Sequence, residues 1–193
     1  MRTQCWLGRM FFGVLLAAVF VPNAAKAADY VMLPAHLAVV FKIKHLGISW
    51  TYGRFNKAKG HFSFDPENVD KASFNLYVDP ASVDTLEKKR DAHLRSADFF
   101  NVKEFPVMKF ESTSVNKGKN GLVVKGNFTM HGVTRKIQFN LNGGKTAMFK
   151  GKNLRGFSTE FMLRRSEYGM KGFLSGVGDE VYIGISFEGL MKD

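Results

Sequence analysis

The chain has 193 residues, 45% of them hydrophobic, and its formal net charge at pH 7 is +11. This length predicts one domain that can bury a stable core on its own. A disulfide framework is excluded because Cys5 is the only cysteine. The lysines and arginines are spread along the chain without a long basic run, which argues against a nucleic-acid partner and favours an anionic membrane surface or an acidic ligand.

The N-terminal segment has the residue order of a secretory signal peptide. Arg2 and Arg9 flank the start of the chain, and the apolar run "MFFGVLLAAVFV" that follows is shorter than the ~20 residues of a membrane-spanning helix. The small-residue triplet "AKA" predicts cleavage after Ala27, so we expect a signal peptide over 1–27 and one mature domain over 28–193. The mature chain would have no cysteine and a net charge of +8, because three basic residues and no acidic residue leave with the signal. An uncleaved membrane anchor is the alternative.

From residue 37 onward, apolar and polar residues alternate, which is the pattern of half-buried β-strands. The first stretch, "AVVFKIKH", places Val39, Phe41 and Ile43 on one face. The alternation recurs in "KASFNLYVD", "VMKFES", "GLVVKGNFTM", "VTRKIQFNL" and "EVYIGISFEG", and further strands are expected over 47–65 and 153–163. Turn residues such as "NKGKNG" and "NGG" separate successive strands. The chain is therefore predicted to be all-β, an extended antiparallel barrel of about eight strands.

One segment, residues 82–96, lacks the alternation and is predicted to form a short helix. Asp84 is followed three residues later by Glu87, which predicts an N-cap at Asp84 with Glu87 as the reciprocal acid of a capping box. The segment has no broad apolar stripe, so we expect it to lie over one opening of the barrel.

Motifs for catalysis or metal binding are missing from the sequence. The segment after Gly156 lacks the second glycine of a nucleophile elbow, and the five histidines do not have zinc-site spacing. We therefore expect no enzyme activity, no catalytic residues, no metal and no cofactor. An enzyme that uses His45, His61 or His93 as acid and base remains an alternative.

Phenylalanine is abundant, with 16 of the 19 lying after the signal peptide. In one interpretation these rings fill the barrel as a solid core, which composition alone favours. In the other they line a hollow tube that takes a long apolar ligand. Alternation looks the same in both cases, so both interpretations stay open.

Seven segments, in the same order and across nearly the whole mature chain, resemble the YceI-like family of bacterial exported proteins. They are "FKIKHLGISWTYGRF", "SVDT", "RDAHLRSADFF", "FPVMKFES", "MHGVTR", "RSEYGM" and "VGDEVYIGI". The resemblance implies a lipocalin-like barrel, a periplasmic location, and an apolar pore that holds a polyisoprenoid or a related long-chain lipid. It implies no catalytic residues.

Residues that face inward on the expected strands would line such a pore, and the phenylalanines after the helix would form an apolar stopper. Arg95 is expected to meet a polar ligand head, and residues 163–170 are expected to form a mobile lip at a mouth. The expected ligand-binding residues are Val39, Phe41, Ile43, Phe74, Leu76, Val78, Phe99, Phe100, Phe105, Phe110, Phe128, Ile137, Phe139, Phe157, Phe161, Ile183 and Ile185.

The expected function is that of a periplasmic binding or carrier protein for a polyisoprenoid or an amphiphilic lipid, with transient contact to a membrane surface and no nucleic-acid partner. A homodimer is left open. The alternatives are a filled barrel with a stress-related structural role, and an enzyme that acts on a small apolar substrate in the cavity.

Overall fold

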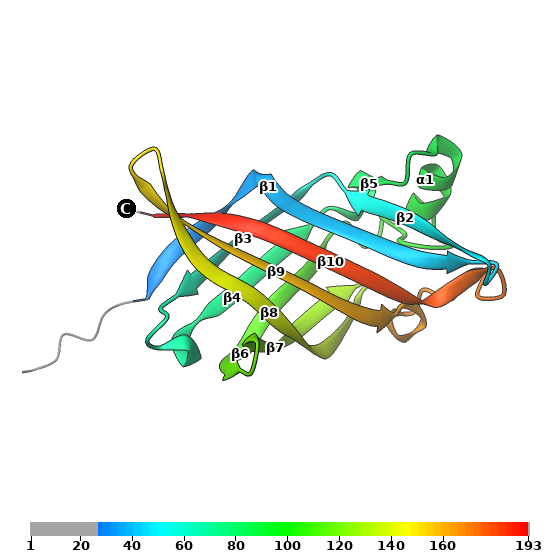
Figure 1. Cartoon of the computed structure of the whole chain (residues 1–193). Helices are drawn as coiled ribbons and strands as arrows, with labels where there is room; N and C mark the ends of the chain where they lie inside the picture. Colours follow the sequence, from blue (N-terminus) through cyan, green and yellow to red (C-terminus); the bar gives the residue numbers. More distant parts are fainter. Residues whose placement is uncertain (1–26, 193) are drawn as a thin grey trace, which may run out of the picture.

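A computed structural model describes residues 27–192 of the chain (Figure 1). The predicted signal peptide lies outside the described residues except for Ala27, and the first strand begins directly after it, at Ala28. No helix in the described part is both long enough and apolar enough to cross a membrane.

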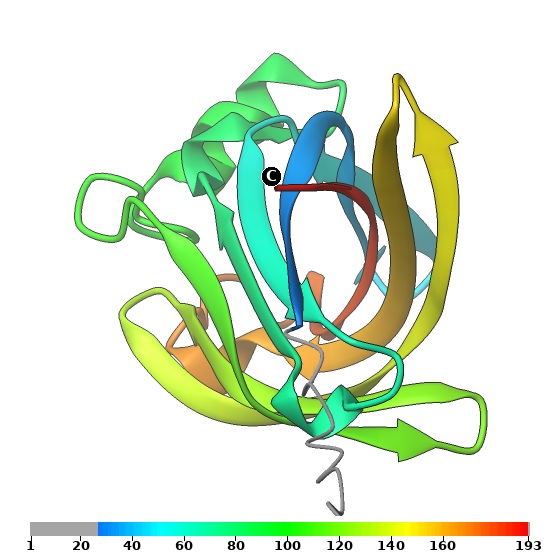
Figure 2. The ribbon, with the colours of Figure 1, turned by 90° about the vertical axis from the view of Figure 1, so that its left-hand side faces the viewer.

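The described chain is a closed antiparallel β-barrel, viewed along its axis in Figure 2. The sheet order is β10-β9-β8-β7-β6-β4-β3-β1-β2-β5, and pairing of β10 with β1 closes it. The strands are β1 (Ala28–His45), β2 (Ser49–Phe55), β3 (Ala58–Phe64), β4 (Ser73–Val78), β5 (Val83–Asp84), β6 (Met108–Gly118), β7 (Gly121–Met130), β8 (Val133–Phe149), β9 (Lys152–Arg164) and β10 (Val177–Met191).

Eight strand positions make up the wall of the barrel, as predicted. β2 and β3 follow one another along the same edge of β1, since β3 pairs with Ala28–Val31 and β2 with Val39–His45. β5 is only two residues long and pairs with the end of β2. The long strands β1, β8 and β10 form the extended part of the barrel (Figure 1).

The helix α1 (Lys88–Arg95) lies within the segment predicted to be helical, but it starts later than expected. The predicted cap was wrong: Glu87 is the N-cap, and its carboxylate accepts the backbone N–H of Arg90 at 2.5 Å. Asp84 does not cap the helix because it lies before the N-cap residue and its carboxylate instead accepts the backbone N–H of Leu86 and the side-chain amide of Asn56, both at 3.0 Å. α1 lies at the end of the barrel far from the start of β1 and the end of β10 (Figure 1). We call this the helix end, and the opposite one the terminal end.

Short 3-10 helices complete the fold. They are η1 (Val69–Lys71), η2 (Pro80–Ser82) and η3 (Arg165–Tyr168). η2 and β5 lead into α1, and η3 connects β9 to the loop before β10, so two of the three lie beside the helix end.

Aromatic rings close the terminal end of the barrel. Their ring centroids lie between 4.7 and 6.3 Å apart. Gly189 makes room for them, because a side chain there would collide with the Phe62 ring. This aromatic floor consists of Tyr30, Phe62, Phe64, Phe74, Phe157 and Phe187, all of them buried.

Candidate functional site

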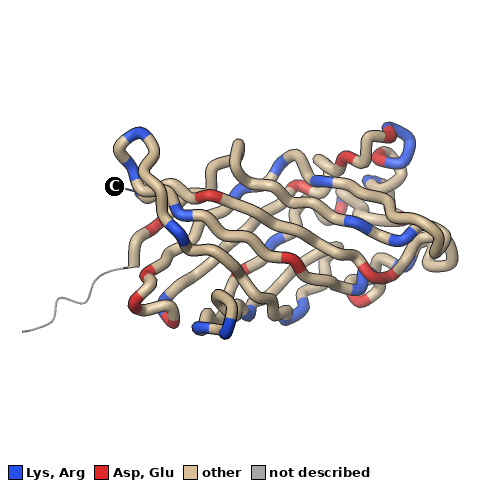
Figure 3. Tube along the Cα trace, in the orientation of Figure 1, with Lys and Arg blue, Asp and Glu red and all other residues tan. Residues whose placement is uncertain are grey.

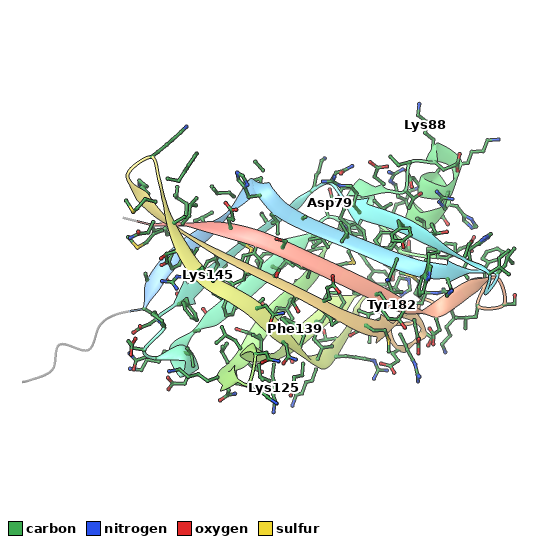
Figure 4. The ribbon with its side chains drawn as sticks, in the orientation of Figure 1. Asp79, Lys88, Lys125, Phe139, Lys145 and Tyr182 are labelled. Atoms are coloured by element: carbon green, nitrogen blue, oxygen red, sulfur yellow. The ribbon has the colours of Figure 1, made fainter. Side chains whose placement is uncertain are left out.

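Above the aromatic floor, two apolar cavities follow one another along the inside of the barrel. The floor cavity has a volume of about 50 Å³ and the helix-end cavity about 100 Å³. Strands from all round the barrel contribute to both, and Figure 4 marks one lining residue, Phe139, near mid-barrel. The two linings share six residues, which we call the waist: Leu76, Val78, Met108, Phe128, Phe161 and Ile185. The two cavities are therefore neighbours within one apolar interior, separated by the side chains of the waist.

The side chains that line this interior are less buried than those of a solid core would be. A filled barrel would bury its inward-facing residues almost completely. Here the following inward-facing residues are only partly buried: Phe41, Ile43, Phe128, Ile137, Phe139, Phe161, Ile183 and Ile185. The interior is thus incompletely filled, although its free volume is small beside the ~300–1,000 Å³ of typical ligand pockets.

Methionines give the lining a means of adjusting its width. Met32 borders the floor cavity, Met130 and Met170 border the helix-end cavity, and Met108 belongs to the waist. A methionine side chain is unbranched and changes rotamer at low cost, so it adapts to the shape of whatever it packs against. Movement of these side chains would therefore change the width of the narrow interior.

Fifteen of the seventeen residues expected to line a pore border one of the two cavities. The other two lie elsewhere. Phe157 lies in the aromatic floor, packed against Phe62, Phe64 and Phe74. Phe105 lies outside the cavities with its ring 4.6 Å from that of His131, over the β7–β8 turn.

Several lining residues were not among those expected. Some of them follow the same inward alternation as their strands and could have been found from it; others, such as Arg165 and Met170, lie after the end of β9 where no alternation exists. The additional residues are Met32, Val40, Phe55, Asn75, Leu94, Met108, Lys109, Met130, Leu141, Thr159, Leu163, Arg165, Met170, Val177, Val181 and Phe187.

The helix end is closed by aromatic residues, in part as expected. Phe99 and Phe100 border the helix-end cavity. On its outer side Phe99 stacks on Phe173, with centroids 6.1 Å apart and planes 9° from parallel, and His93 meets both rings edge-on. Gly172 allows this closure, because a side chain there would collide with the backbone oxygen of Asp98. The loop before β10 is thus pressed against the exit of α1.

Charged residues of α1 attach the helix to the barrel wall. The buried Asp91 carboxylate accepts the backbone N–H of Thr85 at 2.9 Å and its hydroxyl at 2.6 Å. Arg90 donates to the hydroxyl and carbonyl oxygens of Thr85 at 2.7 and 2.8 Å. Arg95 donates to the carbonyl oxygens of Ala81 and Val83 at 2.7 and 2.8 Å. This corrects the expectation that Arg95 meets a ligand head, because its guanidinium holds the helix in place.

A second polar cluster fixes η3 to the start of β10. Arg165 is 2% exposed and donates to the carbonyl oxygens of Gly178, Met170 and Val177 at 2.8, 3.0 and 2.8 Å. Burial lowers the pKa of this guanidinium. Burial also disfavours ionisation of Asp179, but two hydrogen bonds from Ser166 and the charge of Arg165 outweigh it and lower the Asp179 pKa. These contacts do not support a mobile lip over 163–170.

Ionisation of Tyr168 in η3 should make the free energy of unfolding depend on pH in the alkaline range. Burial raises the pKa of its phenol to about 12. The folded protein keeps this phenol neutral. The stabilisation that results should therefore be complete below the ordinary tyrosine pKa of about 10 and should disappear as the pH rises toward 12. In urea unfolding, the free energy of unfolding should fall less between pH 8 and pH 11 for Tyr168→Phe than for the wild type. Tyr52→Phe on the exposed face of β2 is the control, and identical losses in wild type and Tyr168→Phe would contradict the assignment.

The histidines considered for catalysis lie away from the two cavities. His45 and His61 are exposed on strands, and the Nε2 atom of His93 lies 2.9 Å from an Asp98 carboxylate oxygen on the outside of α1. Within residues 27–192, no three His, Cys, Asp or Glu side chains come together in a way that could hold a metal ion. The interior itself offers apolar surface and a few polar groups. Among its lining residues in 27–192 only Arg165 brings a charged side chain to it, because the Lys109 amine pairs with Glu111 at 3.0 Å on the exposed side of β6.

Comparison with known proteins identifies the fold family. The model of the YceI-like domain matches residues 30–189, nearly all of the described part. The chain belongs to the YceI-like family. This YceI-like chain is 36% identical over 196 residues to a UPF0312 protein of Shewanella baltica (strain OS195), covering 95% of this chain and 98% of the relative. The resemblance found in the sequence is therefore confirmed.

Solved structures share the barrel. A YceI protein of Campylobacter jejuni is 29% identical to this YceI-like chain and has a TM-score of 0.69, covering 78% of this chain and 90% of that one. A polyisoprenoid binding domain from Saccharophagus degradans, implicated in plant cell wall breakdown, has a TM-score of 0.64 and covers 86% of this chain and 100% of its own. It is 14% identical, so it supports the fold alone.

Proposed function

We propose that this YceI-like domain is an exported, periplasmic binding protein that holds the chain of a polyisoprenoid or a similar long-chain lipid along its axis. The observation that carries the proposal is the incompletely filled apolar interior with its two adjoining cavities, bounded by the aromatic floor and by the rings of Phe99 and Phe100. The shared fold with a polyisoprenoid binding domain supports it.

Binding of such a ligand follows from burial of apolar surface. Each Å² removed from water contributes roughly 25 cal/mol, so a long hydrocarbon chain binds tightly with few polar contacts. A branched isoprenoid chain is slender, and the narrow interior suits it better than a bulky compact ligand. The waist must widen on binding, and the four methionines described above supply the adaptable part of the wall.

Native mass spectrometry tests the proposal directly. The protein is purified gently from the periplasm of its own cells, weighed without denaturation, and then extracted with organic solvent. We expect one lipid per barrel, released by solvent and identified as a long-chain isoprenoid or an amphiphile of similar length. Bare polypeptide would contradict the proposal and favour a filled barrel with a structural role, whereas a small, chemically altered molecule would favour the enzyme.

A further inference from the structure

Two turns at the helix end expose large apolar side chains side by side. The β1–β2 turn and the loop before β10 are joined by a hydrogen bond from the Leu46 N–H to the Gly176 carbonyl, 2.7 Å long. Both lie at the extreme tip of the barrel (Figure 1), and no charged residue occurs in 46–49 or 172–178 (Figure 3). We call the following four residues the tip patch: Leu46, Ile48, Phe173 and Leu174, exposed by 59%, 82%, 58% and 44%.

Such a patch is unusual for turns, which are normally polar. A single exposed apolar side chain needs no explanation, but adjacent large ones mark a surface that binds another apolar surface. The flanking strands indicate which kind of surface. Behind the tip patch, the Trp50 and Tyr182 rings meet edge-on on the outer face of β2 and β10, with centroids 5.4 Å apart; Figure 4 marks Tyr182 toward this end.

Lysines accompany these two rings. Lys42 Nζ lies 5.0 Å from the Trp50 ring centroid and 5.6 Å from that of Tyr182, and Lys44 Nζ lies 4.3 Å from that of Trp50. Among residues 27–192, neither lysine forms an ion pair with a carboxylate. The Glu180 carboxylate accepts the Tyr182 hydroxyl at 3.3 Å, but it also lies 3.7 Å from Arg164, so its charge is paired. The four residues behind the tip patch, Trp50, Tyr182, Lys42 and Lys44, therefore form a positively charged collar.

We propose that the helix end docks on an anionic phospholipid surface. An apolar tip followed by tryptophan, tyrosine and lysine reproduces the order of groups found where proteins enter the interface of a bilayer. The tip patch inserts between lipid chains, the Trp50 and Tyr182 rings lie at headgroup depth, and Lys42 and Lys44 lie near the phosphates.

Docking also places the membrane next to the closure of the barrel. Phe173 of the tip patch stacks on Phe99, which borders the helix-end cavity, so one layer of side chains separates the lipid surface from the interior. A pull on Phe173 toward the bilayer uncovers Phe99. This use of the surface as a route for lipid rests on the proposed function, but docking itself does not.

The opposite end of the barrel supplies a matched control. The β8–β9 hairpin exposes Met148 and Phe149 by 67% and 47%, and Lys150 Nζ lies 5.3 Å from the Phe149 ring centroid. This hairpin thus has similar side chains, but the aromatic floor separates it from the cavities.

Vesicle flotation tests the docking surface. Wild-type protein should float with vesicles of phosphatidylglycerol and phosphatidylcholine in equal parts, and less with pure phosphatidylcholine. Ile48→Ser/Phe173→Ser should weaken binding by about tenfold or more, because two large apolar side chains are lost from the contact. Lys42→Gln/Lys44→Gln should remove the preference for phosphatidylglycerol, and Met148→Ser/Phe149→Ser should bind like the wild type.

Three results would overturn the proposal. The first is that the wild type floats with neither kind of vesicle. The second is that Met148→Ser/Phe149→Ser loses binding while Ile48→Ser/Phe173→Ser keeps it. In the third case, size-exclusion chromatography would show a dimer that Ile48→Ser/Phe173→Ser dissociates, which would assign the patch to a second copy of the chain. In each of these cases a lipid found by native mass spectrometry would still support the proposed function.

Discussion

If the barrel holds a lipid chain as proposed, Ile185→Trp is expected to abolish co-purification of that lipid. Ile185 belongs to the waist and borders both cavities, whose volumes are only about 50 and 100 Å³. A tryptophan ring at this position would add bulk to the waist between them, so that the waist could not widen for a chain that runs along the axis. Native mass spectrometry and solvent extraction, done as for the wild type, should show bare polypeptide.

Ser186→Trp is the matched control for this variant. Ser186 is the next residue of β10 and is exposed on the outer face, so a tryptophan there should leave the lipid content unchanged.

Overpacking a core costs about 1–3 kcal/mol, and the thermal unfolding transition of Ile185→Trp should confirm that the variant is folded. If Ile185→Trp does not fold, Ile137→Phe in the floor cavity offers a smaller change with the same expected direction. A folded variant with full lipid content would show that the ligand does not pass the waist.

Arg165→Met is expected to lower the free energy of unfolding by about 2–3 kcal/mol. The buried guanidinium donates to three backbone carbonyl oxygens, those of Met170, Val177 and Gly178. A methionine fills similar volume but leaves these carbonyl groups without their donors, and the bond to Met170 is fully buried, where water cannot replace it. Urea unfolding at neutral pH, followed by circular dichroism, measures the loss.

Arg164→Met separates the effect of the hydrogen bonds from that of charge. Arg164 is adjacent in sequence and its side chain is 57% exposed, with one 3.7 Å ion pair to Glu180. Exposed ion pairs contribute at most about 1 kcal/mol, so Arg164→Met should lower the free energy of unfolding only slightly. Equal losses for the two variants would mean that Arg165 does not anchor η3 to β10.

Arg165 and the tip patch together restrict where the barrel can open. Arg165 fixes both ends of the loop between η3 and β10, since its partners are Met170 on one side and Val177 and Gly178 on the other. Between these anchors the loop carries Phe173, which closes the interior by stacking on Phe99. The expected opening is therefore a local movement of this loop, with the barrel wall unchanged.

Much of the architecture follows from the sequence alone. The two-residue alternation specifies which side of each strand is apolar, and this predicted an antiparallel barrel and the inward direction of residues such as Phe41, Phe74 and Ile183. The break in the alternation located α1, and the ordered segments identified the YceI-like family, which the comparison confirmed.

Only the tertiary structure decided what each inward-facing residue does. Phe157 and Phe161 lie on the same face of β9, yet Phe157 packs in the floor and Phe161 borders both cavities. Alternation gives a residue's face but not its height along the axis or the space opposite it, because both depend on how distant strands are brought together when β1 pairs with β10. The same reason hid Arg165, whose partners are set by the approach of η3 to β10, and it is why alternation alone did not distinguish a filled barrel from a hollow one.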